Sequence, residues 1–267
     1  MTLAAEDLAR TARRAPRLQI VARTGSTNTD LVAALTADAA AWPHLSLWVT
    51  DEQLAGRGRL GRDWIAPAGT AIAASTVVDV RALPAASRGW IPLLAGAAMA
   101  RAVAAQLGAA HSVRVKWPND VLVDGRKICG ILAETVAGVD GVVVVGAGVN
   151  TTMDAATLPV STATSFAALG ALCRVDDLLD DYLRALDELC SALVGERGDA
   201  VRAGVHGEIE ALCATLGQSV RVLLPGDGEL VGEAVRLGPT GELVVRSATG
   251  EASVVAGDVV HVRPFGG

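Results

Sequence analysis

Hydrophobic and polar positions follow two different patterns along the chain. Up to about residue 216, short runs of β-branched residues alternate with longer segments in which apolar residues recur at helical spacing. From residue 217 onward, short β-rich runs are separated by turn sequences such as PGDGE, GPTGE and ATGE, a pattern typical of a small antiparallel barrel. The sequence therefore predicts two domains, residues 1–216 and residues 217–267.

The larger domain contains both helical and strand patterns. The segment 87–107 is apolar at nearly every position and predicts a long buried helix, whereas 175–195 and 199–213 have the mixed pattern of helices with one polar face. Asp124-Gly125 between two apolar runs predicts a hairpin with a tight turn. Strands are also predicted over 18–22, 45–50, 70–80, 113–115 and 142–145, helices over 6–14 and 31–42, and a loop over the polar, glycine-rich residues 51–69.

Composition excludes several classes of protein. The 267 residues are 51% hydrophobic and 19% charged, which is enough apolar material for a large core and excludes a disordered chain. A net charge of −6 disfavours non-specific binding to duplex DNA, which requires a basic face. No charge-free apolar run reaches the length of a membrane span, and the N-terminus lacks the apolar core of a signal peptide. We therefore expect neither a nucleic acid nor a membrane as partner.

Cysteine and histidine spacings give no sign of a metal site. The four cysteines form no CxxC motif, and the four histidines are scattered without the spacing of metal ligands. Free thiols of this kind are typical of a reducing compartment, so we expect a cytoplasmic protein.

Two rare residue types stand at informative places. Only two of the 23 cationic residues are lysines, Lys116 and Lys127, and only three asparagines occur, Asn28, Asn119 and Asn150. Bias toward a GC-rich genome explains why these residues are scarce but does not explain where they remain. Arginine replaces lysine readily on solvated surfaces, but not where a compact ammonium must contact one oxygen. These five positions are therefore candidates for function.

A glycine-rich loop between residues 56 and 61 matches the pattern G-x-G-x-x-G, and Asp79 lies 23 residues beyond it. A dinucleotide-binding fold needs a helix directly after such a loop, whereas the sequence here continues RDWIAPAG, which disfavours one. The arginines of the loop, Arg57, Arg59 and Arg62, instead suit charge-assisted hydrogen bonds to a phosphate or carboxylate. We expect the loop to be disordered until such a ligand binds. The competing interpretation is a solvated basic turn.

Further polar residues follow predicted strands. Lys116 ends a strand directly before Trp117-Pro118, where its ammonium can meet a phosphoryl oxygen. Asn119 and Asp120 are suited to capping the turn that follows. The glycines of segment 146–148 would let a ligand approach the backbone closely, with Asn150 at the rim.

Taken together, these motifs resemble the biotin protein ligase family. The motifs are Ser26-Thr27-Asn28, Gln53, GRGRLGR at 56–62, KWPND at 116–120, GRKICGILAE at 125–134 and GAGVN at 146–150. The resemblance implies an α+β fold: a catalytic domain with a mixed β-sheet packed with helices, followed by an SH3-like β-barrel. It also implies two half-reactions, in which biotin and ATP form biotinyl-5′-AMP and the biotinyl group then passes to a lysine of the biotin carboxyl carrier domain of an acyl-CoA carboxylase.

The resemblance also implies roles for individual residues. Lys116 and Arg59 are expected to act in catalysis, and Mg²⁺ is expected to arrive with ATP rather than in a protein metal site. The residues expected to bind biotin are Ser26, Thr27, Asn28, Gln53, Gly56, Arg57, Gly58, Arg59 and Lys116. The residues expected to bind ATP are Arg57, Arg59, Arg62, Trp64, Lys116, Asn119, Lys127 and Asn150.

Two residues have roles that the motifs leave open. Trp64 closes the arginine loop, where it can stack on adenine or pack against the body of the domain. Arg263 can reach from the C-terminal domain toward the nucleotide or lie on a surface strand. Some members of the family carry an N-terminal winged helix-turn-helix, and about 17 residues before the first strand are too few for one. We therefore expect a monofunctional, monomeric ligase that does not bind operator DNA.

Three alternatives remain at this point. A lipoate or octanoate ligase would use the same fold and the same phosphate chemistry. A sensor that binds biotin or a nucleotide without transferring anything would not need both Lys116 and the arginine loop. A regulator that only binds DNA is disfavoured by the short N-terminus and the acidic charge.

Overall fold

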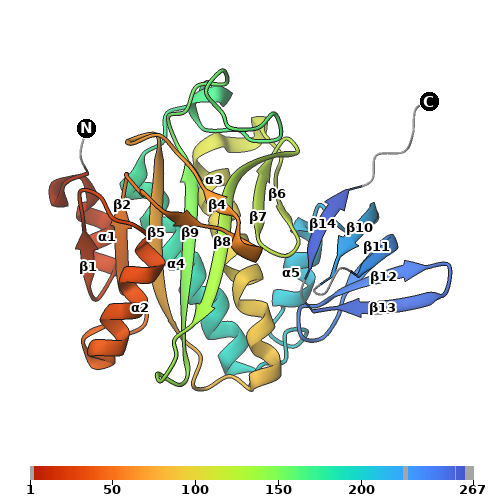
Figure 1. Ribbon diagram of the computed structural model, residues 1–267. Helices are drawn as coiled ribbons and strands as arrows, with labels where there is room; N and C mark the ends of the chain where they lie inside the picture. The colour runs from red at the N-terminus through yellow and green to blue at the C-terminus, as the bar shows by residue number, and fades with distance from the viewer. Residues whose placement is uncertain (1–2, 225–227, 256, 262–267) are drawn as a thin grey trace.

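A seven-stranded mixed sheet forms the centre of the N-terminal domain in the computed structural model, which describes residues 3–224, 228–255 and 257–261 (Figure 1). Its strand order is β1-β2-β5-β9-β8-β7-β6, with β1 and β2 parallel and every other neighbouring pair antiparallel. The strands are β1 (Leu18–Ile20), β2 (Leu47–Thr50), β5 (Ala71–Asp79), β6 (Val113–Lys116), β7 (Asp120–Val123), β8 (Arg126–Thr135) and β9 (Val142–Asn150).

Two long helices cover one face of this sheet, α3 (Ile91–Leu107) and α4 (Val175–Gly195), and both lie behind the strands in Figure 1. The segment 85–110 is long and apolar enough to cross a membrane by length and composition alone. In the structure α3 packs between the sheet and α4, with eleven of its residues buried, so its apolar character belongs to the core. The predicted helix over 87–107 thus begins as the 3₁₀ turn η4 (Ala85–Trp90), and α3 follows with a proline in its first turn.

The opposite face carries α2 (Thr27–Ala37), which contacts β9, β5 and β2. Helix α2 begins earlier than predicted because Ser26 is its N-cap, with the Ser26 hydroxyl accepting a hydrogen bond from Thr29 N at 3.5 Å. This start places Thr27 and Asn28 in the first helical turn, where both side chains are buried against the sheet. The remaining helical elements are η1 (Ala5–Leu8), α1 (Ala9–Arg14), η2 (Ala39–Ala41), η3 (Arg59–Gly61), η5 (Gly108–Ala110), η6 (Ala167–Leu169) and α5 (Val205–Leu212).

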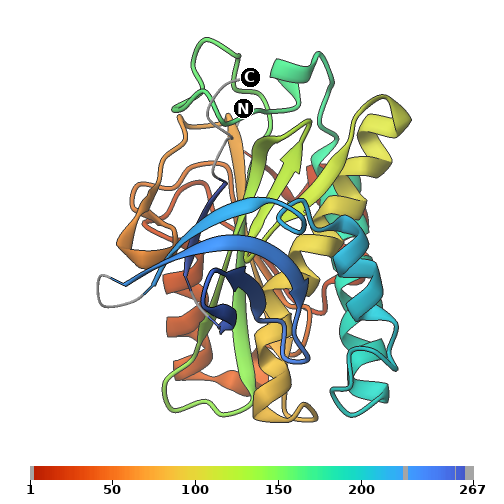
Figure 2. The ribbon, with the colours of Figure 1, turned by 90° about the vertical axis from the view of Figure 1, so that its right-hand side faces the viewer.

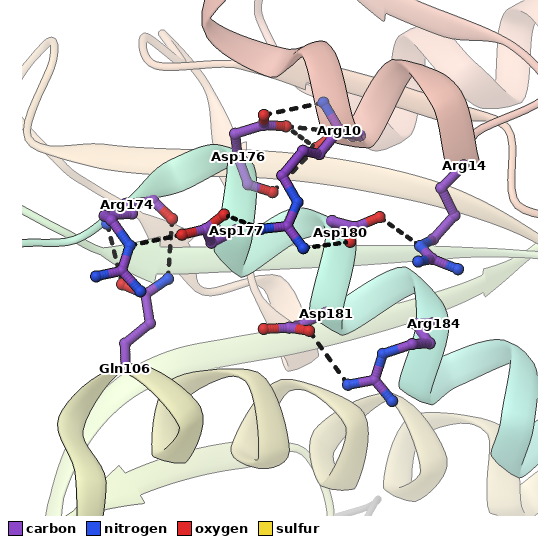
Figure 3. A network of polar contacts seen from close by, with 10 residues as sticks. Arg10, Arg14, Gln106, Arg174, Asp176, Asp177, Asp180, Asp181 and Arg184 are labelled. Carbon is purple, nitrogen blue, oxygen red and sulfur yellow. Dashed lines mark hydrogen bonds and ion pairs between the residues drawn. The ribbon is translucent and has the colours of Figure 1, made fainter.

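The N-terminal helix α1 is fastened to α4 by an acid–base network, shown in Figure 3. The Asp176 carboxylate accepts hydrogen bonds from the backbone N–H groups of Arg10 and Thr11, at 2.9 and 2.8 Å. Arg10 also lies 2.7 Å from Asp177, and further contacts join Arg14 to Asp180. Residues 3–17 therefore pack on α4 of the N-terminal domain as a short helical strap.

The C-terminal domain is a five-stranded antiparallel sheet of order β13-β12-β11-β10-β14, which lies beyond the β6 edge of the large sheet (Figures 1 and 2). In β10, buried and exposed side chains alternate, as expected for a strand with one face in a core. The predicted α+β class with a small β domain is confirmed, whereas the boundary at 216/217 stays a prediction and Arg263 lies outside the described residues. The strands are β10 (Ser219–Leu223), β11 (Glu229–Leu237), β12 (Leu243–Ser247), β13 (Gly250–Val254) and β14 (Asp258–His261).

The two domains are joined by a pair of buried tryptophans. Trp90 Nε1 donates a hydrogen bond to Pro239 O, and Trp117 Nε1 donates one to Gly241 O, each at 3.0 Å. Both carbonyls belong to the turn between β11 and β12, and Gly241 has the positive φ of +87° that this turn requires. One turn of the C-terminal domain is thereby fixed to the end of η4 and to the KWPND motif itself.

Candidate functional site

A cavity opens on the face of the sheet that carries α2. Its walls are the first turn of α2, the arginine loop and the ends of β7 and β8, and its floor is formed by β8 and β9. In Figure 1 the segment that carries β4 crosses in front of β8 and β9, and its residues Asp63 and Trp64 line the cavity. Eleven of the predicted site residues line it: Ser26, Thr27, Asn28, Gln53, Arg57, Gly58, Arg59, Arg62, Trp64, Asn119 and Lys127.

The arginine loop is folded as a small hairpin. Strand β3 (Gly56–Arg57) pairs with β4 (Asp63–Trp64), and Gly58 N donates to Arg62 O at 2.6 Å. At its tip, Leu60 and Gly61 both have positive φ angles, 55° and 71°. Residues 62–70 contain no helix, in agreement with the rejection of a dinucleotide-binding fold. The expectation that this hairpin orders only with a ligand stays a prediction.

The Trp64 indole lies on the floor of the cavity, over two glycines. A Cβ atom added to Gly148 would lie 2.5 Å from Trp64 Cε2, and one added to Gly130 would lie 3.2 Å from Trp64 Cζ3. A Cβ on Gly146 would likewise collide with the carboxamide of Asn28. We predicted that the glycines of 146–148 admit a ligand to the backbone; in the structure they admit the side chains of Trp64 and Asn28 instead. Trp64 therefore packs against the sheet and at the same time lines the cavity.

A chain of hydrogen bonds supports the wall formed by α2. Gln53 Oε1 accepts from Thr27 N at 2.9 Å, and Ser75 Oγ lies 2.7 Å from Thr27 Oγ1. Ser75 also donates to Asn28 Oδ1 at 2.6 Å, and Asn28 Nδ2 donates to Glu134 Oε2 at 2.7 Å. Because Thr27, Asn28 and Ser75 are all buried, this wall presents fixed, uncharged hydrogen-bonding groups.

The structure places Lys127, and not Lys116, at the cavity. Lys127 Nζ lies 2.6 Å from Asp120 Oδ1 and 5.7 Å from the centre of the Trp64 ring. Lys116 is outside the lining, and among the described residues no hydrogen bond or ion pair of its ammonium is found. In the β7–β8 hairpin Lys127 pairs with Leu122, just past a register shift between Val121 and Leu122, and its side chain reaches along the strand to the Asp120 carboxylate. Lys127 thus lines the cavity and Lys116 does not, and the catalytic role expected of Lys116 stays a prediction.

Two other predicted residues act as structural supports outside the lining. Asn150 is buried, and its Nδ2 donates to Thr164 O at 2.9 Å, which holds the segment after β9 against the sheet. Gly56 leaves room for its neighbours, since a Cβ there would lie 2.8 Å from Gln53 Nε2. Asn119 is both support and lining: its Nδ2 donates to Ile131 O at 2.7 Å, and its Oδ1 accepts from Arg59 at 3.4 Å.

Several lining residues had no signal in the sequence. Most are strand residues whose side-chain direction depends on register, and Ser75 and Glu134 support the lining from outside it. Glu134 could have been predicted, because it is the last residue of the GRKICGILAE motif. The segment 146–148 was expected to lie beside a ligand, and the lining residues for which no binding role was predicted are Leu60, Asp63, Ala73, Asp120, Gly130, Ile131 and Leu132.

The cysteines and the acidic residues limit the possible chemistry. Burial raises the pKa of the Cys129 thiol well above its ordinary value, and burial raises that of Cys190 to about 12, so neither forms a nucleophilic thiolate at neutral pH. Within the described part of the chain, no group of three or more histidine, cysteine, aspartate or glutamate side chains could hold a metal ion. The cavity lining instead carries three arginines and one lysine against the two aspartates Asp63 and Asp120, so it is positively charged overall and faces a neutral polar wall.

Comparisons with known proteins agree with this geometry. Residues 20–150 match the biotin/lipoate A/B protein ligase family, and residues 215–262 match the biotin protein ligase C terminal domain. The chain is 37% identical to the biotin–[acetyl-CoA-carboxylase] ligase of Mycobacterium tuberculosis over 248 residues, which is 92% of this chain and 90% of the relative.

Solved structures also resemble the chain. The biotin protein ligase of Aquifex aeolicus, in complex with biotin and ATP, is 22% identical with a TM-score of 0.74, covering 93% of this chain and 99% of the other, and shows the fold. The biotin protein ligase of Leishmania major, in complex with biotinyl-5-AMP, is 26% identical with a TM-score of 0.58 and covers 90% of this chain and 99% of the other.

Proposed function

Since the chain belongs to the biotin/lipoate A/B protein ligase family, we propose that its cavity forms biotinyl-5′-AMP from biotin and ATP and then transfers the biotinyl group to a protein lysine. The protein is an ATP-dependent biotin–[acetyl-CoA-carboxylase] ligase. The roles of individual residues are supported by the fact that the cavity has two chemically different sides. A neutral hydrogen-bonding wall faces a set of cationic side chains, which suits a ligand with a polar, uncharged ring at one end and an anion at the other.

The neutral wall fits the ureido ring of biotin. Thr27 and Asn28 are buried and Gln53 is half-buried, and together they provide both donors and acceptors, which the ureido group needs. These groups already hydrogen-bond to one another, and a ureido group can exchange into that network, whereas the apolar end of an octanoyl or lipoyl chain has nothing to exchange. This contrast disfavours the lipoate or octanoate alternative.

The cationic side is suited to the first half-reaction. A carboxylate oxygen of biotin attacks the α-phosphorus of ATP, the P–O bond to the β-phosphate breaks, and pyrophosphate leaves with the electron pair. The carboxylate is already a nucleophile, so no general base is required. Lys127, Arg57, Arg59 and Arg62 would stabilise the negative charge that develops on the phosphoryl oxygens, and Asp120 would orient Lys127. Mg²⁺ would enter with ATP, bound chiefly by the phosphates, since the described residues offer no acidic cluster for it.

In the second half-reaction the acceptor lysine, as a neutral amine, attacks the carbonyl carbon of the biotinyl-AMP anhydride. The C–O bond to AMP breaks, AMP leaves with the electron pair, and the amine loses a proton as the amide forms. The closed hairpin would keep water from the anhydride until the acceptor arrives.

The acceptor is the biotin carrier domain of a carboxylase, following the names of the curated relatives. We further propose that the protein works as a monomer in the cytoplasm and does not bind operator DNA. Sedimentation of the free protein tests whether it is a monomer, and a gel-shift assay tests whether it binds operator DNA.

The substrate is tested by pyrophosphate–ATP exchange in Mg²⁺ with biotin, lipoate and octanoate supplied separately. Exchange with biotin alone is expected. Exchange with lipoate or octanoate but not with biotin would overturn the assignment of biotin as the substrate. Absence of exchange with all three compounds would support the alternative of a non-catalytic sensor.

A further inference from the structure

Glu134 contacts two walls of the cavity at once, although it lies outside the lining. Its Oε2 accepts a hydrogen bond from Asn28 Nδ2 at 2.7 Å, and its Oε1 lies 3.3 Å from a guanidinium nitrogen of Arg57. Asn28 belongs to the α2 wall, and Arg57 belongs to the arginine hairpin. We propose that Glu134 is a positioning residue that latches the hairpin to the α2 wall and thereby retains the adenylate in the cavity. This inference rests on the proposed function.

The two contacts of Glu134 differ in strength in the way that a latch requires. Asn28 is 4% exposed and also donates to Leu132 O at 3.2 Å, so its contact with Glu134 is a fixed part of the wall. The side chain of Arg57 is 49% exposed and that of Glu134 is 27% exposed, and an ion pair at this exposure is weak. The carboxylate therefore stays with the wall, while the hairpin can leave it and return.

The backbone on the sheet side is held in register. Glu134 pairs with Val144 in the β8–β9 ladder, and Leu132 pairs with Gly146 in the same register. Side chains at alternate positions of a strand share a face, so Leu132 and Glu134 both face the cavity side of the sheet. Since β8 is an interior strand of the large sheet, the moving partner in the latch is the hairpin.

A second contact of Arg57, to an uncharged acceptor, supports the same closure of the hairpin. An Arg57 guanidinium nitrogen donates to Thr29 Oγ1 at 3.1 Å, and Thr29 lies on α2 one residue after Asn28. Arg57 thus reaches α2 directly through Thr29 and indirectly through Glu134. These two contacts can be removed separately, which makes the latch testable.

The test is the rate at which bound biotinyl-AMP leaves the enzyme. The adenylate is formed in the cavity from biotin and ATP with pyrophosphatase, and its release is followed after a chase with unlabelled biotin. Glu134→Gln keeps the size of the side chain and an oxygen for Asn28 but removes the charge that attracts Arg57. We expect release to be about two- to fivefold faster in this variant, while biotin-dependent exchange at saturating substrates stays within about twofold of the wild type.

Further variants and ionic strength separate a latch from a merely structural role. Thr29→Val is expected to speed release by a smaller factor, and Glu134→Asp, which keeps the charge, is expected to restore part of the retention. Salt screens a half-exposed ion pair, so the rates of the wild type and Glu134→Gln are expected to converge as ionic strength rises. The control is Glu251→Gln in the C-terminal sheet, where the carboxylate lies 2.6 Å from Arg236; it is expected to release adenylate at the wild-type rate.

Unchanged release in both Glu134→Gln and Thr29→Val, with thermal unfolding showing that both variants are folded, would overturn the latch. So would a rate difference between the wild type and Glu134→Gln that does not shrink in high salt. Neither result touches the proposed function, which fails instead if the wild-type protein shows no biotin-dependent exchange.

Discussion

The Lys127 ammonium lies 2.6 Å from the Asp120 carboxylate, and both side chains line the cavity. The two residues come from the neighbouring strands β8 and β7, so the hairpin itself brings the charges together. A lysine side chain has four rotatable bonds, and a fixed carboxylate beside it limits where the ammonium can point. The pair therefore accounts for how one flexible cation can be held ready for a phosphoryl oxygen.

Replacing Asp120 by asparagine is expected to slow biotin-dependent exchange by about tenfold, because Lys127 would lose the charged partner that orients it. Asp124→Asn is the matched control, since Asp124 lies in the turn of the same hairpin and contacts His111 at 2.7 Å, away from the cavity lining. Equal rates for the two variants in a pyrophosphate-exchange assay would show that Asp120 does not position Lys127.

A methyl group at residue 148 is expected to disturb the cavity more than the fold. In Gly148→Ala the new Cβ would overlap the Trp64 ring, so the indole must shift and the Michaelis constants for biotin and ATP should rise about tenfold or more. Gly207→Ala in α5 meets no atom within 4 Å and should leave both constants unchanged. Steady-state kinetics, with tryptophan fluorescence as a second readout, checks this. Wild-type constants in Gly148→Ala would mean that the position of Trp64 is unimportant.

The tryptophans between the domains are expected to contribute to stability through their indole N–H groups. Trp90→Phe and Trp117→Phe would each leave a carbonyl of the β11–β12 turn without its donor, which costs about 1–3 kcal/mol of unfolding free energy. Trp48→Phe provides the comparison, because the buried Trp48 Nε1 has no hydrogen-bond partner among the described residues. Urea denaturation checks the ranking. If Trp48→Phe lowered the free energy of unfolding as much as the other two variants do, the effect would come from ring size and not from the hydrogen bonds.

Acid is expected to weaken the ion pairs at the N-terminus of α4, where Asp177 contacts Arg174 and the strap residue Arg10. The hydrogen bond from Arg174, aided by Arg10, holds the pKa of Asp177 below its usual value. A carboxyl whose pKa is lower in the folded state stabilises that state above the pKa of the unfolded chain, about 3.9. This contribution is lost as the pH falls through the lower, folded value. Urea denaturation between pH 5 and pH 2.5 should therefore show a shallower decline in Asp177→Asn than in the wild type, and parallel declines would contradict the assignment.

The sequence motifs located the site more accurately than they assigned its chemistry. The fold class and eleven lining residues followed from short local motifs, such as GRGRLGR and Ser26-Thr27-Asn28, and from the family resemblance that these motifs carry. The placement of Lys127 in the lining and of Lys116 outside it did not, because it depends on the pairing of the β7–β8 hairpin and on a register shift that no residue pattern marked. Ser75 was likewise hidden, since a serine in an apolar strand has meaning only once its neighbours across the sheet are known.

The most direct measurement is biotin-dependent pyrophosphate–ATP exchange in Lys127→Met compared with Lys116→Met. Removing a cation from the site of phosphoryl charge is expected to slow exchange by about a hundredfold or more in Lys127→Met. Lys116→Met should retain exchange close to the wild-type rate, because Lys116 lies outside the cavity lining. Full exchange in Lys127→Met together with its loss in Lys116→Met would contradict the site described here.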